Sequence, residues 1–354
     1  MVSYVSSLFF YFILLQLLLK QISPVAGSKI PALIVFGDST VDTGNNNGLN
    51  TILKSNFAPY GRDFEGGRPT GRFCNGRVAS DFFSEYLGLN KTLPAYLDTS
   101  FNMSDFVTGV NFASAGTGYD NTTTAVFNVI PLTKEIEYYK EYQQKLRDYI
   151  GVDKANDILS RAVYIMSMGT NDFLESYFLR PTLKIKYTVQ EYEDHLVSIA
   201  KNFVEEIYSL GARKITLAGL PPMGCLPLER TIHFKAITKC NEYYNNVALE
   251  YNAKLKAMLD LLSTQLPAIQ LYFSDPYYII LQMIQTPSQF GMTESSKACC
   301  GTGYVEMSYL CIVDDKLSCS DAGKYVFWDS FHPSEKAYQI LSQDIFNNVL
   351  YKFL

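Results

Sequence analysis

The sequence ALIVFGDS, residues 32–39, decides the fold class of this chain. Residues 32–36 are apolar without a break, which is typical of a central strand in a parallel sheet covered on both faces. Gly37 permits a tight exit from the strand, and Ser39 then stands beyond its carboxyl end, where open α/β sheets bind their ligands. This stretch therefore predicts an α/β fold whose chemistry lies where the first strand ends.

The rest of the chain alternates apolar runs with amphipathic helical segments. Further strands are expected at residues 110–113, 162–168, 214–218 and 269–273. The helical spacing of apolar residues predicts helices at residues 78–87, 192–210 and 237–262. Strands that alternate with helices form right-handed crossovers, so we expect a central five-stranded parallel sheet between two layers of helices. No repeat or linker divides the chain, and residues 28–354 are expected to form a single domain.

The first 27 residues are predicted to be a signal peptide that is removed on export. Residues 8–19 (LFFYFILLQLLL) form an apolar run too short to span a bilayer comfortably, and SPVAGS at residues 23–28 suits cleavage. No Lys or Arg precedes the run, so a signal anchor is the alternative. No later stretch is long and apolar enough for a transmembrane helix. We therefore expect a secreted monomer, extracellular or in a cell wall, without a stable membrane anchor.

Sequons and cysteines agree with export. Three N-x-S/T sequons begin at Asn90, Asn102 and Asn121, which are candidate glycosylation sites. Four of the seven cysteines lie within twenty-one residues near the C-terminus, in a loop that disulfides could staple. A zinc cluster is the alternative, but there is no C-x-x-C pair and no nearby His, so no metal is expected. The cysteines are Cys74, Cys225, Cys240, Cys299, Cys300, Cys311 and Cys319, of which 225 and 240 are one plausible pair and at least one is left over.

Charge and missing motifs exclude several classes of function. The formal net charge is −5, so no nucleic-acid partner is expected. The sequence contains no Walker loop, no G-x-G-x-x-G and no H-E-x-x-H, so we expect no cofactor. G-x-S-x-G is also absent, which excludes the nucleophile elbow of the α/β-hydrolases as the scaffold.

The chain has three histidines, which makes the search for a general base short. His195 lies among charged residues of an expected helix, and His233 has Glu229 as its one nearby carboxylate in sequence. His332 lies in FWDSFHP, where the following proline disfavours helical geometry and Asp329 stands three residues earlier. A tight turn would bring this carboxylate to the imidazole and orient it, as in a serine triad. Taken alone, the Asp-x-x-His spacing is weak evidence for a catalytic pair, and structural roles for the two residues are the alternative.

Ser39 is the candidate nucleophile because it follows the first strand directly. A helix N-cap is the alternative, and the two roles are compatible, since a helix N-terminus directs N–H groups toward an incoming anion. Donors for a developing oxyanion are expected from two strand-end loops. Gly116 in the loop after the second strand lets a backbone N–H approach a substrate, and Asn171 after the third strand offers a side-chain amide.

Six sequence blocks appear in a specific order: FGDSTVDTGNNN (36–47), GGRPTGRFCNGR (66–77), NFASAGTG (111–118), GTND (169–172), GLPPMGC (219–225) and DSFHP (329–333). With these blocks the chain resembles the plant-type GDSL esterase/lipases of the SGNH hydrolase superfamily over essentially all of the expected mature chain. The resemblance implies a three-layer α/β/α, flavodoxin-like SGNH hydrolase fold. Thr40 stands where the family's title has Leu; since this position supplies no group to the mechanism, we expect only a local change in packing.

The resemblance also implies roles for individual residues. Ser39 would be the nucleophile, His332 the general base and Asp329 the acid that orients this base. The backbone N–H groups of Ser39 and Gly116, with the Asn171 side chain, would form the oxyanion hole.

Four arginines of the second block region have two interpretations. They could steer an anionic substrate, or they could be solvated or paired with Asp63, Glu65 and Asp81 in an ordered loop, which is the favoured interpretation. The four are Arg62, Arg68, Arg72 and Arg77.

The leading hypothesis for function is hydrolysis of acyl or acetyl esters of lipids or polysaccharides through an acyl-enzyme on Ser39. One alternative is an acyltransferase that uses the same site with a hydroxyl acceptor. A second is a non-catalytic carbohydrate- or lipid-binding protein on the same scaffold. The substrate itself does not follow from the sequence, because a fold does not name one.

Overall fold

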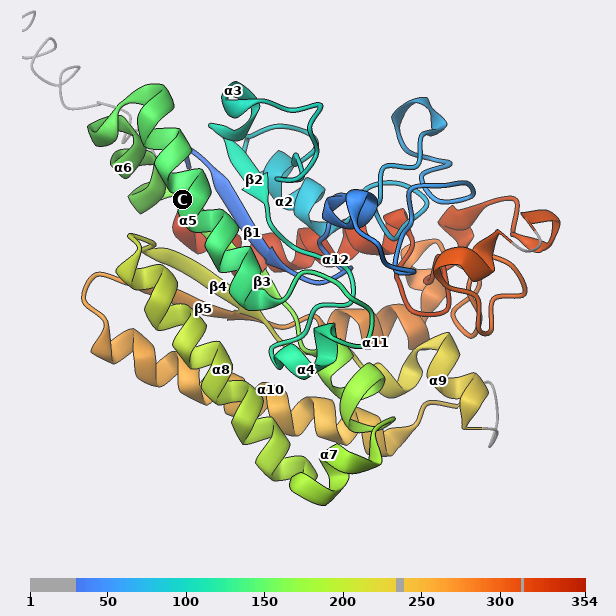
Figure 1. The fold of residues 1–354 in the computed structure, drawn as a ribbon. Helices are drawn as coiled ribbons and strands as arrows, with labels where there is room; N and C mark the ends of the chain where they lie inside the picture. Colours follow the sequence, from blue (N-terminus) through green and yellow to red (C-terminus); the bar gives the residue numbers. More distant parts are fainter. Residues whose placement is uncertain (1–29, 234–238, 313–314) are drawn as a thin grey trace, which may run out of the picture. The chain divides into compact units, whose positions relative to one another are not determined.

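A parallel sheet organises the structure, a computed structural model that describes residues 30–233, 239–312 and 315–354. The strands are β1 (Leu33–Gly37), β2 (Gly109–Asn111), β3 (Val163–Ser167), β4 (Lys214–Ala218) and β5 (Gln270–Ser274). They pair in the order β2-β1-β3-β4-β5, and every pair is parallel (Figure 1). The predicted five-stranded parallel sheet is confirmed. From β1 the chain crosses to β2 on one side of it and later to β3 on the other side. Sheets of this kind bind ligands at such a switch point, here at the ends of β1 and β3.

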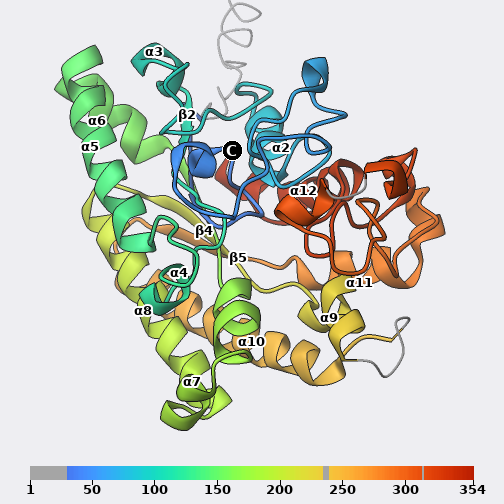
Figure 2. The same cartoon turned by 45° about the vertical axis from the view of Figure 1, so that its right-hand side comes forward.

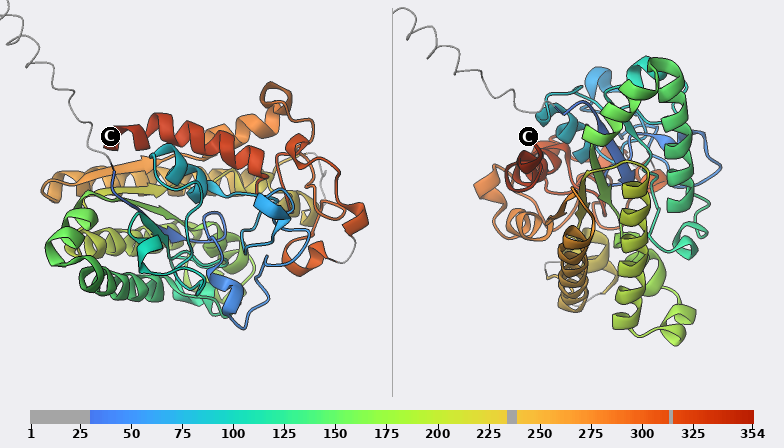
Figure 3. Two further views of the ribbon diagram at one scale, coloured as in Figure 1. Left: turned by 90° about the horizontal axis from the view of Figure 1, so that it is seen from above. Right: turned by 90° about the vertical axis from the view of Figure 1, so that its left-hand side faces the viewer.

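Helices cover both faces of the sheet, as Figures 1 and 3 show. One layer contains α2 (Ala79–Tyr86), α11 (Tyr277–Gln285) and α12 (Glu335–Asn348); the other contains α5 (Leu132–Ile150), α8 (Val189–Ser209) and α10 (Glu242–Gln265). The connections carry shorter helices, seen from a second side in Figure 2: α3 (Met103–Phe106), α4 (Asn121–Thr124), α6 (Val152–Arg161), α7 (Pro181–Lys186) and α9 (Pro227–Ile232). A π-helical segment, Asp172–Tyr177, follows β3 directly.

Side chains of the strands alternate between the two helical layers. Phe36 of β1 points toward α5 and α8, where its ring centroid lies 5.5 Å from that of Tyr139 and 5.2 Å from that of Phe203. The Phe112 ring stacks on the Phe36 ring, with 5.4 Å between the two centroids. These aromatic contacts belong to one continuous buried core. The core fixes the positions of the strand ends, and these ends carry the site.

The helix predicted at residues 237–262 is wrong at its start. α10 begins at Glu242, where the Asn241 side chain accepts a hydrogen bond from the Tyr243 N–H and caps the helix. Cys240 precedes this cap and is bonded to Cys225, so its apolar spacing only imitated a helical position. Residue 237 lies outside the described residues. The helices expected at 78–87 and 192–210 are present as α2 and α8, with ends that differ by up to three residues.

The exit from β1 requires a glycine. Gly37 has φ 146°, and a side chain there would collide with the backbone carbonyl oxygen of Ser167 in β3. The chain then makes one tight turn, in which the N–H groups of Val41 and Asp42 donate to the Asp38 carbonyl at 3.2 and 2.9 Å. No described helix begins at this turn, so Ser39 does not serve as the N-cap that its sequence position also allowed.

Three disulfides close loops of the described chain. They join Cys225–Cys240, Cys299–Cys319 and Cys300–Cys311, and Cys74 is free and buried. The last two staple the loop before α12 in which the cysteines cluster. The predicted signal peptide falls on residues outside those described. Within the described ranges, no helix combines the length and apolar character that a bilayer crossing requires.

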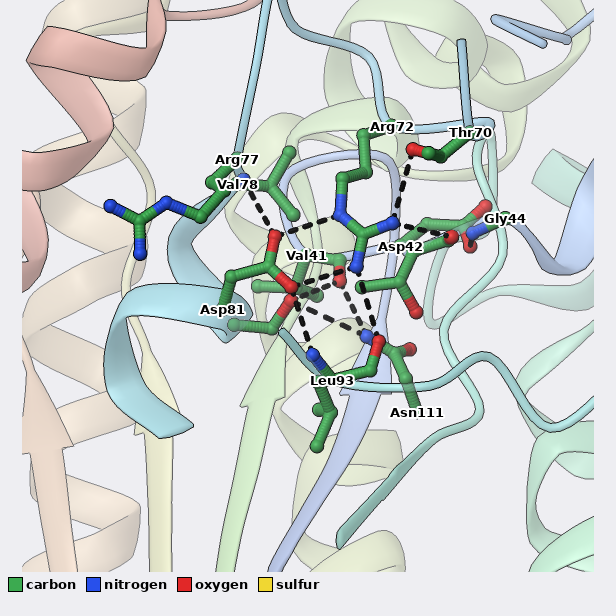
Figure 4. A network of polar contacts seen from close by, with 12 residues as sticks. Val41, Asp42, Gly44, Thr70, Arg72, Arg77, Val78, Asp81, Leu93 and Asn111 are labelled. Carbon is green, nitrogen blue, oxygen red and sulfur yellow. Dashed lines mark hydrogen bonds and ion pairs between the residues drawn. The ribbon is translucent and has the colours of Figure 1, made fainter. Parts of the chain in front are cut away.

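A buried ion pair ties α2 to the loop that follows β1 (Figure 4). The Arg72 guanidinium donates to both carboxylate oxygens of Asp81 at 2.7 Å, and the two side chains are 6% and 0% exposed. Arg72 also donates to the Thr43 carbonyl at 3.2 Å, and the Leu93 N–H donates to Asp81 at 3.0 Å. The pair is therefore fully hydrogen-bonded, and it supports the structural interpretation of Arg72.

Two further arginines of this segment are also paired. Arg62 lies 3.5 Å from the Asp63 carboxylate. Arg77 lies 2.7 Å from Glu85, and it also contacts a carboxylate at the start of α12, so its partners are not those that the sequence suggested. These ion pairs favour an ordered loop over a device that steers an anionic substrate.

We expect Arg72→Met to lower the free energy of unfolding by about 3–5 kcal/mol, because it leaves the Asp81 carboxylate buried without its cation. Urea unfolding of the oxidised protein, followed by circular dichroism, measures the change. Lys140→Met is the control: it breaks an exposed ion pair with Glu206, for which we expect less than about 1 kcal/mol. Equal losses in the two variants would contradict the importance given to the buried pair.

Candidate active site

Ser39, His332 and Asp329 form a continuous chain of hydrogen bonds. Ser39 Oγ lies 2.8 Å from His332 Nε2, and His332 Nδ1 lies 2.8 and 2.9 Å from the two carboxylate oxygens of Asp329. All three residues are buried, with exposed fractions of 5%, 2% and 0%. The structure thus brings together the three residues predicted as a triad, although 293 positions separate the serine from the histidine.

A tight turn before α12 places the imidazole. Asp329 Oδ1 accepts the backbone N–H groups of Phe331 and His332 at 2.9 and 2.7 Å, and the Trp328 N–H donates to the His332 carbonyl at 2.8 Å. The carboxylate therefore shapes the turn and also contacts the ring. The Phe73 ring lies 4.9 Å from the imidazole and limits its movement. This is the local geometry that Asp-x-x-His-Pro predicted.

Tyr60 holds the second oxygen of the same carboxylate. Its hydroxyl donates to Asp329 Oδ2 at 2.7 Å and accepts the Ser308 N–H at 2.8 Å. Burial and the neighbouring Asp329 carboxylate raise the pKa of Tyr60 well above its ordinary range, so the phenol stays protonated as a donor. Ser308 begins a turn that ends at the bonded Cys311. The Asp329 carboxylate is thereby connected to the disulfide-stapled loop.

Ser39, Gly116 and Asn171, the three residues predicted to supply oxyanion donors, line one cleft with His332. Neither the Ser39 N–H nor the Gly116 N–H donates to an acceptor among the described residues. Gly116 has φ 85°, which favours glycine, and a side chain there would collide with Leu53. Asn171 Nδ2 donates to the Thr117 carbonyl at 2.9 Å, which leaves its second hydrogen for a ligand.

Two buried carboxylates hold the loops that carry these donors. Asp42 accepts the N–H of Ala115, the residue directly before Gly116, at 3.0 Å. Asp172, which directly follows Asn171 in the sequence, accepts the Tyr119 N–H at 2.7 Å. Burial raises the pKa of Asp42 to about 6 and that of Asp172 to about 7, while the donated N–H groups oppose the shift. Loop geometry is therefore fixed by polar contacts rather than by apolar packing alone.

Thr40, the departure from the family's title motif, makes polar contacts. Its hydroxyl donates to Asp38 Oδ1 at 2.6 Å and lies 3.0 Å from the Ser167 hydroxyl of β3. Burial raises the pKa of Asp38 to about 6, and the hydrogen bonds from Thr40 oppose this shift. The substitution therefore alters the local contacts of the turn without placing a group in the cleft.

The other two histidines lie away from the cleft, as their sequence contexts suggested. His195 of α8 lies 3.6 Å from Asp120, and His233 lies 3.4 Å from Glu229. Among the described residues, no group of three or more His, Cys, Asp or Glu side chains could hold a metal ion.

The three sequon asparagines have exposed side chains in the described chain. Asn90 donates to Thr108 at 3.0 Å, Asn102 caps α3, and Asn121 begins α4. Exposure is a necessary condition for glycan attachment, and these residues stay predictions as glycosylation sites.

Sequence reasoning missed Tyr60 and Glu175. Tyr60 meets Asp329 across 269 positions, and no local pattern signals such a contact. Glu175 lines the cleft from the π-helical segment that follows Asn171. Its spacing of four residues from Asn171 was a usable signal, because such residues share a helical face.

We expect Asn171→Ala to lower kcat for ester hydrolysis by about 10²- to 10³-fold, because it removes one oxyanion donor. KM is expected to change little, since the donor acts mainly on the developing charge. Steady-state assays with p-nitrophenyl acetate measure both constants. Asn347→Ala, on the exposed face of α12, is the control. A loss confined to KM would contradict the assigned role.

Comparisons with known sequences give a consistent result. Residues 33–345 match the family described as GDSL-like Lipase/Acylhydrolase. The chain is 56% identical over 338 residues to the GDSL esterase/lipase At4g26790 of Arabidopsis thaliana, with 96% of each chain covered. It is 52% identical over 336 residues to the GDSL esterase/lipase At2g42990 of the same plant, covering 95% of this chain and 96% of that protein.

Among solved structures, the chain is similar to a catalytic mutant of Axe2, an acetylxylan esterase from Geobacillus stearothermophilus. The sequences are 14% identical, the TM-score is 0.41, and the match covers 90% of this chain and 93% of that one.

Proposed function

The chain belongs to the GDSL-like lipase/acylhydrolase family and is a carboxylic ester hydrolase, and from this premise we propose that it acts through an acyl-enzyme on Ser39. The observation that carries the proposal is the unbroken hydrogen-bond chain from Ser39 Oγ through His332 to Asp329. The Ser39 end of this chain lies in a cleft that is also lined by Gly116, and the backbone N–H groups of Ser39 and Gly116 donate to no acceptor among the described residues.

In the first step Ser39 Oγ attacks the ester carbonyl carbon, and its proton moves to His332 Nε2. The carbonyl electrons move to the oxygen, where the N–H groups of Ser39 and Gly116 and the Asn171 amide stabilise the negative charge. Asp329 holds the tautomer and stabilises the imidazolium. The tetrahedral intermediate then collapses, the bond to the alcohol oxygen breaks, and His332 Nε2 gives its proton to the leaving alcohol.

In the second step water attacks the acyl-enzyme while His332 takes its proton. Collapse releases the carboxylic acid and returns the proton to Ser39. A hydroxyl acceptor in place of water would give transesterification by the same chemistry. We assign water as the acceptor and esters of lipids or polysaccharides as the substrates.

We further propose that the protein is a secreted, glycosylated monomer. Three disulfides support an oxidising compartment, where such bonds persist. Exposed sequons at Asn90, Asn102 and Asn121 support glycosylation.

Covalent labelling tests the mechanism. A fluorophosphonate probe is expected to modify Ser39, located by peptide mass spectrometry, and to abolish hydrolysis of p-nitrophenyl acetate in proportion to labelling. Modification of another residue, or full activity of the labelled protein, would refute it. Product analysis in water with added glycerol separates free acid from transferred ester and so decides the acceptor.

A further inference from the structure

Glu175 is a carboxylate in the wall of the cleft that the mechanism does not use. It lines the cleft together with Ser39 and His332, and it comes from the π-helical segment four residues after Asn171. Among the described residues that line the cleft, it is the one acidic side chain. Gly116 and Asn171 also line the cleft, and the rest of its wall is apolar and consists of Leu53, Phe73, Ala115, Phe127, Met307 and Phe331.

The Glu175 carboxylate has no hydrogen-bond or ion-pair partner among the described residues. Its side chain is half-buried. Burial raises the pKa of Glu175, and the nearby His332 partly offsets this rise. A half-buried carboxylate without a donor is costly, because lost hydration is not replaced. A ligand that brings a donor into the cleft therefore gains binding energy at this position.

The alcohol half of an ester must lie against His332, because Nε2 returns its proton to the leaving oxygen. Glu175 and His332 line the same cleft, and the imidazole partly offsets the rise in the pKa of Glu175. An alcohol part that lies against His332 in this cleft is therefore enclosed by the same walls as the Glu175 carboxylate.

Resting on the proposed ester hydrolysis, we propose that Glu175 forms a subsite that accepts hydrogen bonds from hydroxyl groups on the alcohol part of the substrate. The enzyme accordingly prefers esters of polyols or sugars over esters of plain alkanols. Hydrogen bonds to a charged acceptor are strong enough to decide such a preference, and a site built around one rejects analogues that lack the donor.

Two acetates of equal carbon number test this subsite. The full-length oxidised protein is assayed by titrating the acetic acid released from 2,3-dihydroxypropyl acetate and from propyl acetate. Glu175→Leu removes the acceptor at similar size. We expect it to lower the ratio of kcat/KM values for the two esters by about tenfold or more, while kcat/KM for propyl acetate stays equal or rises. Glu175→Gln keeps one acceptor oxygen, and its ratio is expected to fall between those of the wild type and Glu175→Leu.

Glu137→Gln is the matched control. It removes an exposed carboxylate of α5 that pairs with Lys134, and Glu137 does not line the cleft. Its ratio is expected to stay within about twofold of the wild type, because a distant charge is screened. An unchanged ratio in Glu175→Leu, or an equal loss on both esters, would overturn the subsite. Failure of the proposed function itself looks different: the wild type would hydrolyse neither acetate and Ser39 would resist the fluorophosphonate.

Discussion

Ser39→Ala is expected to lower kcat for p-nitrophenyl acetate by about 10⁴- to 10⁶-fold, because it removes the atom that forms the acyl-enzyme. The fold should persist, since Ser39 lies in a turn that is held by backbone hydrogen bonds between Asp38 and Asp42 rather than by its own hydroxyl. A small residual rate is expected from the oxyanion donors alone. The variant has to be assayed at an enzyme concentration about a thousandfold higher than that of the wild type, because the two expected rates differ so widely. A continuous assay suits the wild type, and a stopped assay suits the variant.

Ser198→Ala serves as the matched control for that experiment. The Ser198 hydroxyl is exposed on α8 and donates to the His195 carbonyl at 2.6 Å, so its loss changes one serine without touching the cleft. Its kcat should equal that of the wild type. Activity of Ser39→Ala within tenfold of wild type would remove Ser39 from the mechanism and leave the family assignment intact.

Asp329→Asn should lower kcat by about 10⁴-fold, as expected when the acid of a serine triad can no longer fix the imidazole tautomer. The structure adds a second reason. Asp329 accepts four donors: the N–H groups of Phe331 and His332, the His332 ring and the Tyr60 hydroxyl. An amide NH₂ must face one of these donors, so the turn that carries the base is strained as well.

Asp321→Asn in the same loop is the control, because Asp321 is exposed and caps a short helix away from the cleft. Thermal unfolding and near-ultraviolet circular dichroism report whether Asp329→Asn keeps its fold. A folded variant with kcat within tenfold of wild type would show that the carboxylate is structural, the alternative that Asp-x-x-His by itself left open.

Much of the fold was predictable because it depends on local patterns. Each of the five strands was expected from a short stretch rich in apolar residues, and each is present within about two residues of its expected place. The proximity of Ser39, His332 and Asp329 was predictable from Ser39 at a strand end and from a tight turn at Asp329 and His332. Gly116 follows β2 and Asn171 follows β3, the two strands that flank β1, and the parallel sheet brings their loops together beyond its end.

The remaining features arise from contacts between distant segments. Tyr60 reaches Asp329 only because the loop after β1 folds against the loop before α12. The start of α10 was misplaced because Cys240 continues the apolar spacing, whereas its disulfide to Cys225 and the cap at Asn241 decide the boundary. Glu175 belongs to no motif that the sequence analysis recognised. Its proposed role depends on the residues that line the cleft with it.

The long separation between Ser39 and His332 has a consequence for how the protein acquires activity during synthesis. The proposed nucleophile lies in the turn after the first strand, and its proposed base lies 293 positions later, after the other described strands. A ribosome-bound chain therefore carries a serine without a base until translation passes residue 332. On the proposed mechanism, hydrolysis begins only after residue 332 has been made and the loop before α12 has closed, so we expect products truncated before this loop to be inert toward the esters of the cell that makes them.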